Sequence, residues 1–127
     1  MKANELRIGN LVTYGITDTK IEGIQPSYVW TDFQVGLISI KEIRGIPLTK
    51  EWTDKIDPMS NGTLTVTSDK GVLNYKDGFA FIHSGLGDDD SYGFKVKVDY
   101  VHEIQNLVTD LFKIKLNFKL QHDEQAN

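Results

Sequence analysis

The stretch that decides the second half of the fold is VLNYKDGFAFIH, residues 72–83. Two runs rich in β-branched and aromatic residues flank Asp77 and Gly78. An Asp-Gly pair between such runs favours a two-residue hairpin turn of type I′, in which both central residues take positive φ. We therefore expect two antiparallel strands joined by this turn. Before them, Leu64 and Val66 alternate with threonines, which predicts another strand.

After the hairpin, the apolar residues of FKVKV at positions 94–98 alternate with Lys95 and Lys97, which predicts a half-buried strand. Residues 100–112 carry apolar side chains at helical spacing, with Asp99 available as the N-cap, so we expect a helix there. From Phe112 onward the period becomes two. The sequence therefore predicts a last strand over residues 112–120 with a basic face, followed by a loose tail over residues 121–127.

The N-terminal part has short β-branched and aromatic runs separated by Gly, Pro and Asp. Such spacing predicts several short strands, arranged as a small curled sheet or as an SH3-like barrel. IPLTKEWTDKIDP at residues 46–58 predicts one short helix, because Thr49 can serve as its N-cap and Pro58 limits its continuation.

These elements predict an α+β fold of small antiparallel sheets packed with one short and one longer helix. A chain of 127 residues suits one domain. We expect it over residues 1–120, with a β-rich part (1–57) and a part with strands and a helix (58–120). A formal charge of −4 argues against a protein built to coat DNA or an anionic membrane. Without cysteine, a secretory signal or a long apolar stretch, a cytoplasmic protein without membrane contact is expected.

The loop SGLGDDDSYGF at residues 84–94 holds three consecutive carboxylates, Asp88, Asp89 and Asp90. Counted from Asp88, an EF-hand calcium loop would need an oxygen ligand at Tyr92 and a bidentate Glu at Asp99, and it would need flanking helices. The flanks read as strands instead. We therefore expect no metal here. The loop is either a solvated hairpin tip or an acidic surface for a basic partner.

No catalytic constellation stands out. The three histidines, His83, His102 and His122, lie far apart in sequence without metal-ligand spacing, and we expect His102 on the exposed side of its helix. The glycines form no phosphate-binding or dinucleotide motif. We expect no enzymatic activity and no cofactor.

Lysines offer a different possibility, because they recur on the outward positions of two expected strands. If those strands are neighbours, a strip of up to five lysines could bind phosphates: Lys95, Lys97, Lys113, Lys115 and Lys119. The aromatic residues considered with them, Phe94, Phe112 and Phe118, fall on inward positions and could not stack on bases there. The alternative is that these lysines only keep exposed strands soluble.

Three ordered segments, NELRIGN (4–10), IPLTKEW (46–52) and YVHEIQNL (100–107), resemble an uncharacterised family of small proteins of bacteriophages, prophages and other mobile elements. That family supplies no reaction and no catalytic residues. The resemblance implies a phage or prophage accessory protein in the cytoplasm of a bacterial host. Small acidic phage proteins without an evident active site often act by binding, and anti-CRISPR inhibitors of bacterial immunity are such a class.

Two functional hypotheses follow. The first is a non-catalytic inhibitor that binds a host protein or ribonucleoprotein, such as a CRISPR effector, through Asp88, Asp89, Asp90 and Tyr92, because an acidic loop complements a positive nucleic-acid channel. The alternative is an accessory protein that binds RNA or DNA through the lysine-lined sheet face.

Overall fold

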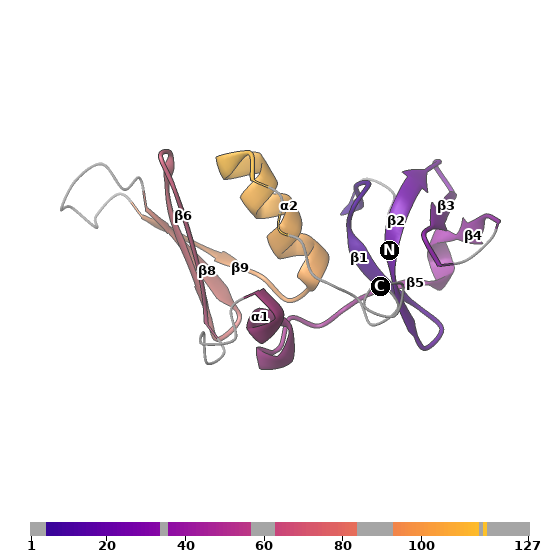
Figure 1. Ribbon diagram of the computed structural model, residues 1–127, viewed down its shortest axis with the longest axis horizontal. Helices are drawn as coiled ribbons and strands as arrows, with labels where there is room; N and C mark the ends of the chain where they lie inside the picture. Colours follow the sequence, from indigo (N-terminus) through magenta and orange to yellow (C-terminus); the bar gives the residue numbers. More distant parts are fainter. Residues whose placement is uncertain (1–4, 34–35, 57–62, 84–92, 115, 117–127) are drawn as a thin grey trace, which may run out of the picture. The chain divides into compact units, whose positions relative to one another are not determined.

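The computed structural model describes residues 5–33, 36–56, 63–83, 93–114 and 116. The chain is an α+β protein, as predicted, and it divides into two compact units. Unit 1 holds the described residues of Met1–Pro47 and Tyr100–Asn106, and unit 2 holds those of Leu48–Asp99 and Leu107–Phe118. Figure 1 colours both units along the sequence. The short helix, which we expected in the N-terminal part, belongs to unit 2.

Unit 1 is built on one antiparallel sheet with the strand order β4-β3-β2-β1-β5. Its strands are β1 (Leu11–Tyr14), β2 (Thr17–Ile24), β3 (Tyr28–Thr31), β4 (Ile38–Ser39) and β5 (Ile43–Gly45), and the 3-10 turn η2 (Ile40–Glu42) precedes β5. No pairing among the described residues closes this sheet into a barrel. Of the two alternatives for this part, the open sheet is therefore the one observed.

The core of unit 1 follows from alternation along its strands. On β3, for example, Val29 and Thr31 are buried while Tyr28 and Trp30 face outward. The buried apolar cluster comprises Leu6, Val12, Ile21, Val29, Ile38, Ile40 and Ile43.

Buried amides tie the start of the chain to the helix α2 (Val101–Phe112). The Gln105 Oε1 atom accepts a hydrogen bond from the backbone N–H of Leu11 at 2.9 Å, and Gln105 Nε2 donates to the carbonyl of Gly9 at 3.1 Å. Asn10 Nδ2 donates to Asn106 Oδ1 at 2.8 Å. Two of the three segments that carry the family resemblance are thus held together within unit 1, which gives their polar residues a structural role.

Unit 2 contains a four-stranded antiparallel sheet in the order β6-β7-β8-β9. Its strands are β6 (Leu64–Ser68), β7 (Gly71–Lys76), β8 (Phe79–His83) and β9 (Phe94–Lys97). Asp77 and Gly78 join β7 to β8 with φ values of 52° and 88°, so the predicted turn with two positive φ angles is confirmed.

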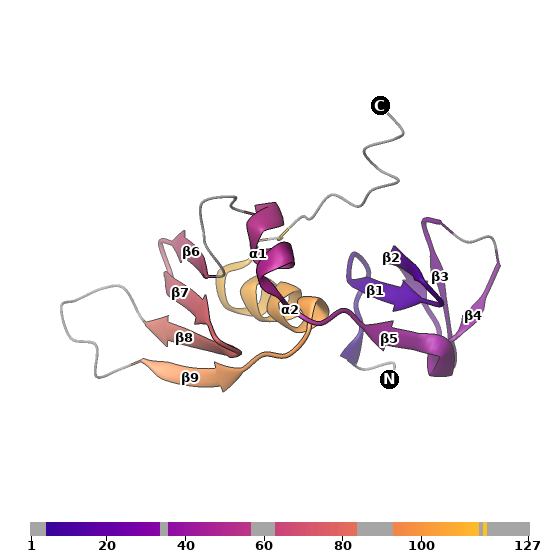
Figure 2. The ribbon, with the colours of Figure 1, turned by 90° about the horizontal axis from the view of Figure 1, so that it is seen from below.

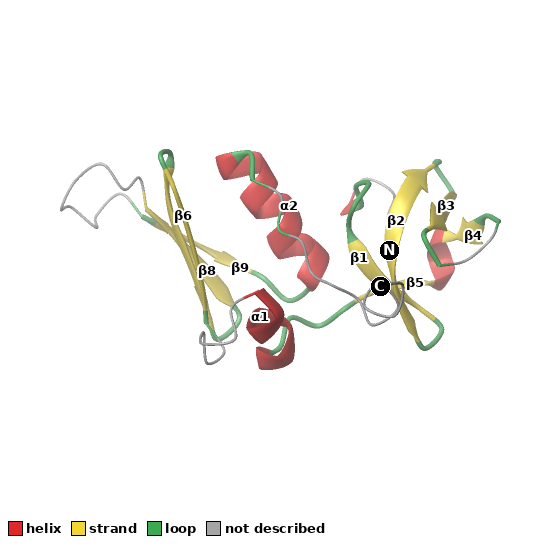
Figure 3. Cartoon of the chain, viewed as in Figure 1, coloured by secondary structure: helices red, strands yellow, loops and turns green. Residues whose placement is uncertain are grey.

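One face of this sheet is covered by helices. Figures 1 and 2 show α1 (Lys50–Ile56) and the C-terminal half of α2 on the same side of the four strands, and Figure 3 marks them as the helices of the unit. The core of unit 2 includes buried side chains from the inward positions of the strands and from both helices: Trp52, Leu64, Val66, Leu73, Tyr75, Ala80, Ile82, Val108 and Phe112. The opposite face carries no other described element of unit 2.

Both ends of α2 differ in detail from the expectation. The helix begins at Val101, and the backbone N–H of Tyr100, at the N-cap position, donates to Glu103 Oε1 at 2.9 Å, as in half of a capping box. The expected cap, Asp99, lies one residue earlier.

At the C-terminal end, Phe112 is the last helical residue and Lys113 takes a φ of 59°, a left-handed conformation that ends helices. The Thr109 hydroxyl then donates to the carbonyl of Ile114 at 3.2 Å. The strand predicted from residue 112 is therefore wrong where it can be checked, because Lys113, Ile114 and Leu116 lie in no strand. Its other residues lie outside the described part of the chain.

Candidate functional site

The face of the unit 2 sheet opposite the two helices presents aromatic side chains from β8. Ala80 and Ile82 point into the core, so Phe79, Phe81 and His83 point outward. Phe81 is 40% exposed, and Phe79 and His83 are partly buried. Two phenylalanines of one strand thus lie on the face opposite the core, and one of them is exposed. They make the face a candidate binding surface.

The strand register surrounds these rings with lysines. Across the β7–β8 pair, Phe79 lies opposite Lys76, and across the β8–β9 pair it lies opposite Lys97. Phe81 lies opposite Lys95. Because directly opposed residues of an antiparallel pair share one face, the two rings and the three lysines lie together on the outer face of the sheet.

Lys95 makes the closest observed contact of this group. Its Nζ atom lies 4.1 Å from the ring centroid of Phe79 and 5.7 Å from that of Phe81. Both distances fall within the range of cation–π attraction, which contributes about 0.5–1 kcal/mol at exposed sites. The ammonium group therefore rests over the rings while its side chain stays exposed to solvent.

The charged side chains within the four strands all have the same sign. Strands β6 to β9 contain three lysines and no Asp or Glu, although the whole chain carries a formal charge of −4. No carboxylate within the strands neutralises the three ammonium groups. The strands thus place lysines beside two aromatic rings, a combination typical of sites that bind single-stranded nucleic acid.

The structure separates the residues that the sequence had grouped. Lys95 and Lys97 lie on the face just described, whereas Lys113 follows α2 in a left-handed conformation and belongs to no strand. It therefore cannot extend the strip as a strand residue. Lys115 and Lys119, and likewise the acidic loop residues Asp88, Asp89, Asp90 and Tyr92, lie outside the described residues.

Sequence reasoning missed Phe79 and Phe81. It considered Phe94, Phe112 and Phe118 as partners for the lysines. Of these, Phe112 is buried as expected, and Phe118 lies outside the described residues. The signal that could have found the missed rings is the turn at Asp77-Gly78: a two-residue loop fixes the register and places Phe79 opposite Lys76.

A second candidate is a cleft of about 370 Å³ in unit 2, lined among others by Tyr75, Asp77 and Asp99. Burial raises the pKa of Tyr75, a backbone hydrogen bond at Gly78 opposes this, and the nearby Asp77 and Asp99 carboxylates add smaller upward effects. Its hydroxyl donates to the carbonyl of Leu48 at 3.2 Å. Tyr75 is thus held as a neutral phenol that supports the fold, and it does not provide a base.

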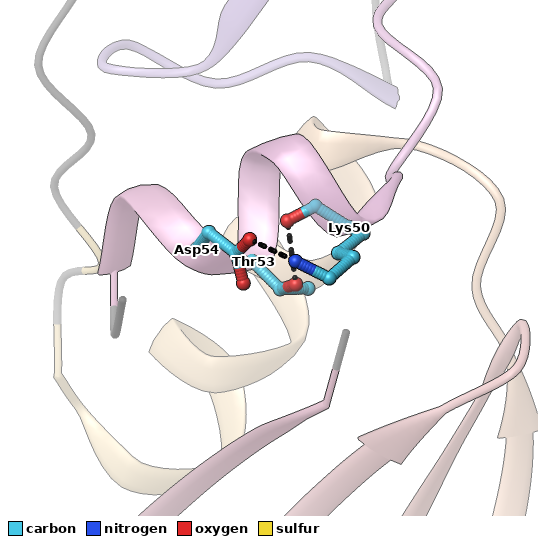
Figure 4. Close-up of polar contacts among 3 residues, drawn as sticks. All are labelled: Lys50, Thr53 and Asp54. Carbon is cyan, nitrogen blue, oxygen red and sulfur yellow. Dashed lines mark hydrogen bonds and ion pairs between the residues drawn. The ribbon is translucent and has the colours of Figure 1, made fainter. Parts of the chain in front are cut away.

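Lys50 also lines this cleft, but its ammonium group is already engaged. Figure 4 shows Lys50 Nζ bonded to Asp54 Oδ2 at 2.7 Å, one helical turn along α1, beside the bond from the Thr53 hydroxyl to the Lys50 carbonyl at 3.0 Å. An exposed pair of this kind contributes about 0–1 kcal/mol to stability. The Lys50 ammonium group is therefore paired within α1.

His102 is buried, with 3% of its surface exposed, so the expectation of a surface histidine is wrong. Its ring stacks on Tyr100 with centroids 5.7 Å apart, and a Cβ at Gly45 would approach both rings to about 3 Å. Burial lowers the pKa of His102, opposed by the carboxylates of Glu103 and Glu5. The glycine makes room for a packed, neutral imidazole.

Among the described residues, no group of three His, Asp or Glu side chains could hold a metal ion. None of the helices in this part of the chain is long and apolar enough to cross a bilayer. Comparisons of the chain with protein-family models, curated proteins and solved structures gave no match. The functional argument therefore rests on the geometry of the sheet face.

Proposed function

We propose that this protein binds nucleic acid through the outer face of β7, β8 and β9. The observation that carries the proposal is the placement of Phe79 and Phe81 among Lys76, Lys95 and Lys97 on a face whose strands have no carboxylate. This was the alternative hypothesis from the sequence. The structure supplies the aromatic rings that the sequence interpretation lacked.

Each component has a physical role. Lysine ammonium groups attract phosphates and release the cations condensed on them, which gives affinity without sequence preference. Aromatic rings stack on base faces, and a stacked base contributes about 1–3 kcal/mol by alanine substitution. The net charge of −4 belongs to the whole chain, whereas lysines are the only charged residues within strands β6 to β9. Charges farther away than about 10 Å are screened at 0.1 M salt.

The test is the affinity of fluorescein-labelled 12-nucleotide RNA and DNA strands, measured by fluorescence anisotropy. Phe81→Ala removes an exposed ring, so it should weaken binding about 5- to 150-fold, the range set by one stacked base, while the unfolding midpoint stays close to that of the wild type. Tyr28→Ala is the matched control, because Tyr28 is 45% exposed on the sheet of unit 1. Equal affinities for the wild type and Phe81→Ala would refute the proposal.

The inhibitor hypothesis, and with it the assignment to a phage or prophage accessory protein, stays a prediction. Its acidic residues lie outside the described part of the chain, and nothing in unit 1 or unit 2 favours a CRISPR effector over another partner. Replacing Asp88, Asp89 and Asp90 together by serine tests it: an inhibitor that uses this loop loses inhibition, and unchanged inhibition removes the loop from the mechanism.

A further inference from the structure

The spacing of the rings on β8 says which form of nucleic acid fits. Resting on the proposed function, we infer that this face takes single strands, with two neighbouring unpaired bases stacked on Phe79 and Phe81, and that Lys95 leaves the rings when the bases arrive.

The first argument is geometric. Phe79 and Phe81 are two positions apart on one strand, so their attachment points are about 6.6 Å apart, twice the rise per residue. Stacked base pairs in a duplex follow each other at about 3.4 Å, with their faces covered by their neighbours. A base on each ring therefore requires a strand that is unstacked and extended to about twice that step.

The second argument concerns the space above the rings. A base stacks on an aromatic ring at about 3.5–4.0 Å between carbon atoms. The Nζ atom of Lys95 lies 4.1 Å from the centroid of Phe79, in the place that such a base would occupy. Lys95 must swing away for stacking to occur. Its long, exposed side chain can then bring the ammonium group to a phosphate of the strand's backbone, next to the stacked base.

Lys97, the other lysine of β9, differs from Lys95 in its contact with the rings. Lys97 lies directly opposite Phe79 on β9 and is exposed, and of the two lysines of β9 only Lys95 has a described contact with a ring face. Lys97 can therefore contact phosphate without first uncovering a ring. The two lysines are a matched pair on one strand, and they should respond differently to removal of their charge.

The test uses four labelled probes: a 12-nucleotide oligothymidine, an oligouridine of the same length, a blunt 12-base-pair DNA duplex and a 12-residue abasic strand. The wild type should bind at least one of the single strands at least tenfold more tightly than both the duplex and the abasic strand. Phe79→Ala combined with Phe81→Ala should abolish this preference while weak, salt-sensitive binding to all four probes persists. The ratio between the two single strands distinguishes DNA from RNA as the preferred ligand.

The outcomes separate the two claims. Equal binding of the single strand, duplex and abasic strand, with Phe81→Ala still weakening the binding, would overturn the inference and leave the proposed function standing. No binding to any probe at about 50 mM salt would overturn both. To test whether Lys95 leaves the rings when bases stack on them, the affinities of Lys95→Gln and Lys97→Gln for the single strand are compared. Lys95→Gln should lose at least twofold less affinity than Lys97→Gln. Equal losses of affinity in the two variants, with unfolding midpoints like that of the wild type, would refute the displacement of Lys95 from the rings.

Discussion

The salt dependence of binding follows from the number of lysines on the outer face of the unit 2 sheet. Three ammonium groups are available, from Lys76, Lys95 and Lys97. Each phosphate neutralised on a single strand contributes about 0.7 to the slope of log K against log salt, so three contacts predict a slope of about −2.1. Between 50 and 200 mM salt, that slope corresponds to about a 20-fold loss of affinity.

Lys97→Gln should remove one contact and change the slope to about −1.4, which corresponds to about a sevenfold loss over the same range. The measurement is a series of anisotropy titrations of a labelled single strand at four or more salt concentrations. Lys41→Gln is the control, because Lys41 is an exposed lysine on η2 of unit 1. A slope for Lys97→Gln equal to that of the wild type, or an equal change in Lys41→Gln, would refute the assignment of this face.

Two further predictions concern the packing of unit 1. In a urea titration, Gln105→Met should lower the free energy of unfolding by about 2–4 kcal/mol, because it leaves the buried N–H of Leu11 and the carbonyl of Gly9 without partners. The control is Gln25→Met, at an exposed position, whose free energy of unfolding should stay within about 0.5 kcal/mol of the wild type. A loss below about 0.5 kcal/mol in Gln105→Met would contradict the observed bonds. The lowered pKa of His102 means that the unfolded chain binds a proton that the folded chain resists. Stability should therefore fall as the pH drops below about 6.5, by at most about 1.4 kcal/mol per pH unit from this residue, and the fall should be smaller in His102→Phe. Identical pH profiles of the two proteins would contradict the burial of a neutral imidazole.

Local signals in the sequence predicted much of the fold. The Asp-Gly turn of the β7–β8 hairpin is observed, because two positive φ angles are cheap only for a few residue types. The helical spacing of Val101, Ile104, Val108 and Phe112 is also observed as the buried side of α2. Both signals depend on residues that are close together in the sequence, so they can be recognised from a single sequence.

Features that depend on partners far along the chain were not predicted. The burial of His102 requires the space that Gly45 leaves beside it, from a strand more than fifty residues earlier. The alternation after Phe112 favoured a strand, but Lys113 ends the helix in a left-handed conformation. A strand also needs a neighbouring strand to pair with, and an alternating pattern alone does not show that one is present.

The candidate site was predicted only in part. Lys95 and Lys97 were identified from the alternation within β9. Phe79 and Phe81 join them only when the register of β8 against β9 is known. Pairing between strands decides which outward side chains are neighbours, and alternation within one strand does not contain that information.

The most direct test of the central claim is an NMR titration of the ¹⁵N-labelled protein with an unlabelled 12-nucleotide single strand. The account predicts that the largest shifts of backbone amide signals fall on β8 (Phe79–His83) and β9 (Phe94–Lys97), with the end of β7 at Lys76 following them. Shifts concentrated on unit 1, for instance around Tyr28 and Trp30 of β3, would contradict it.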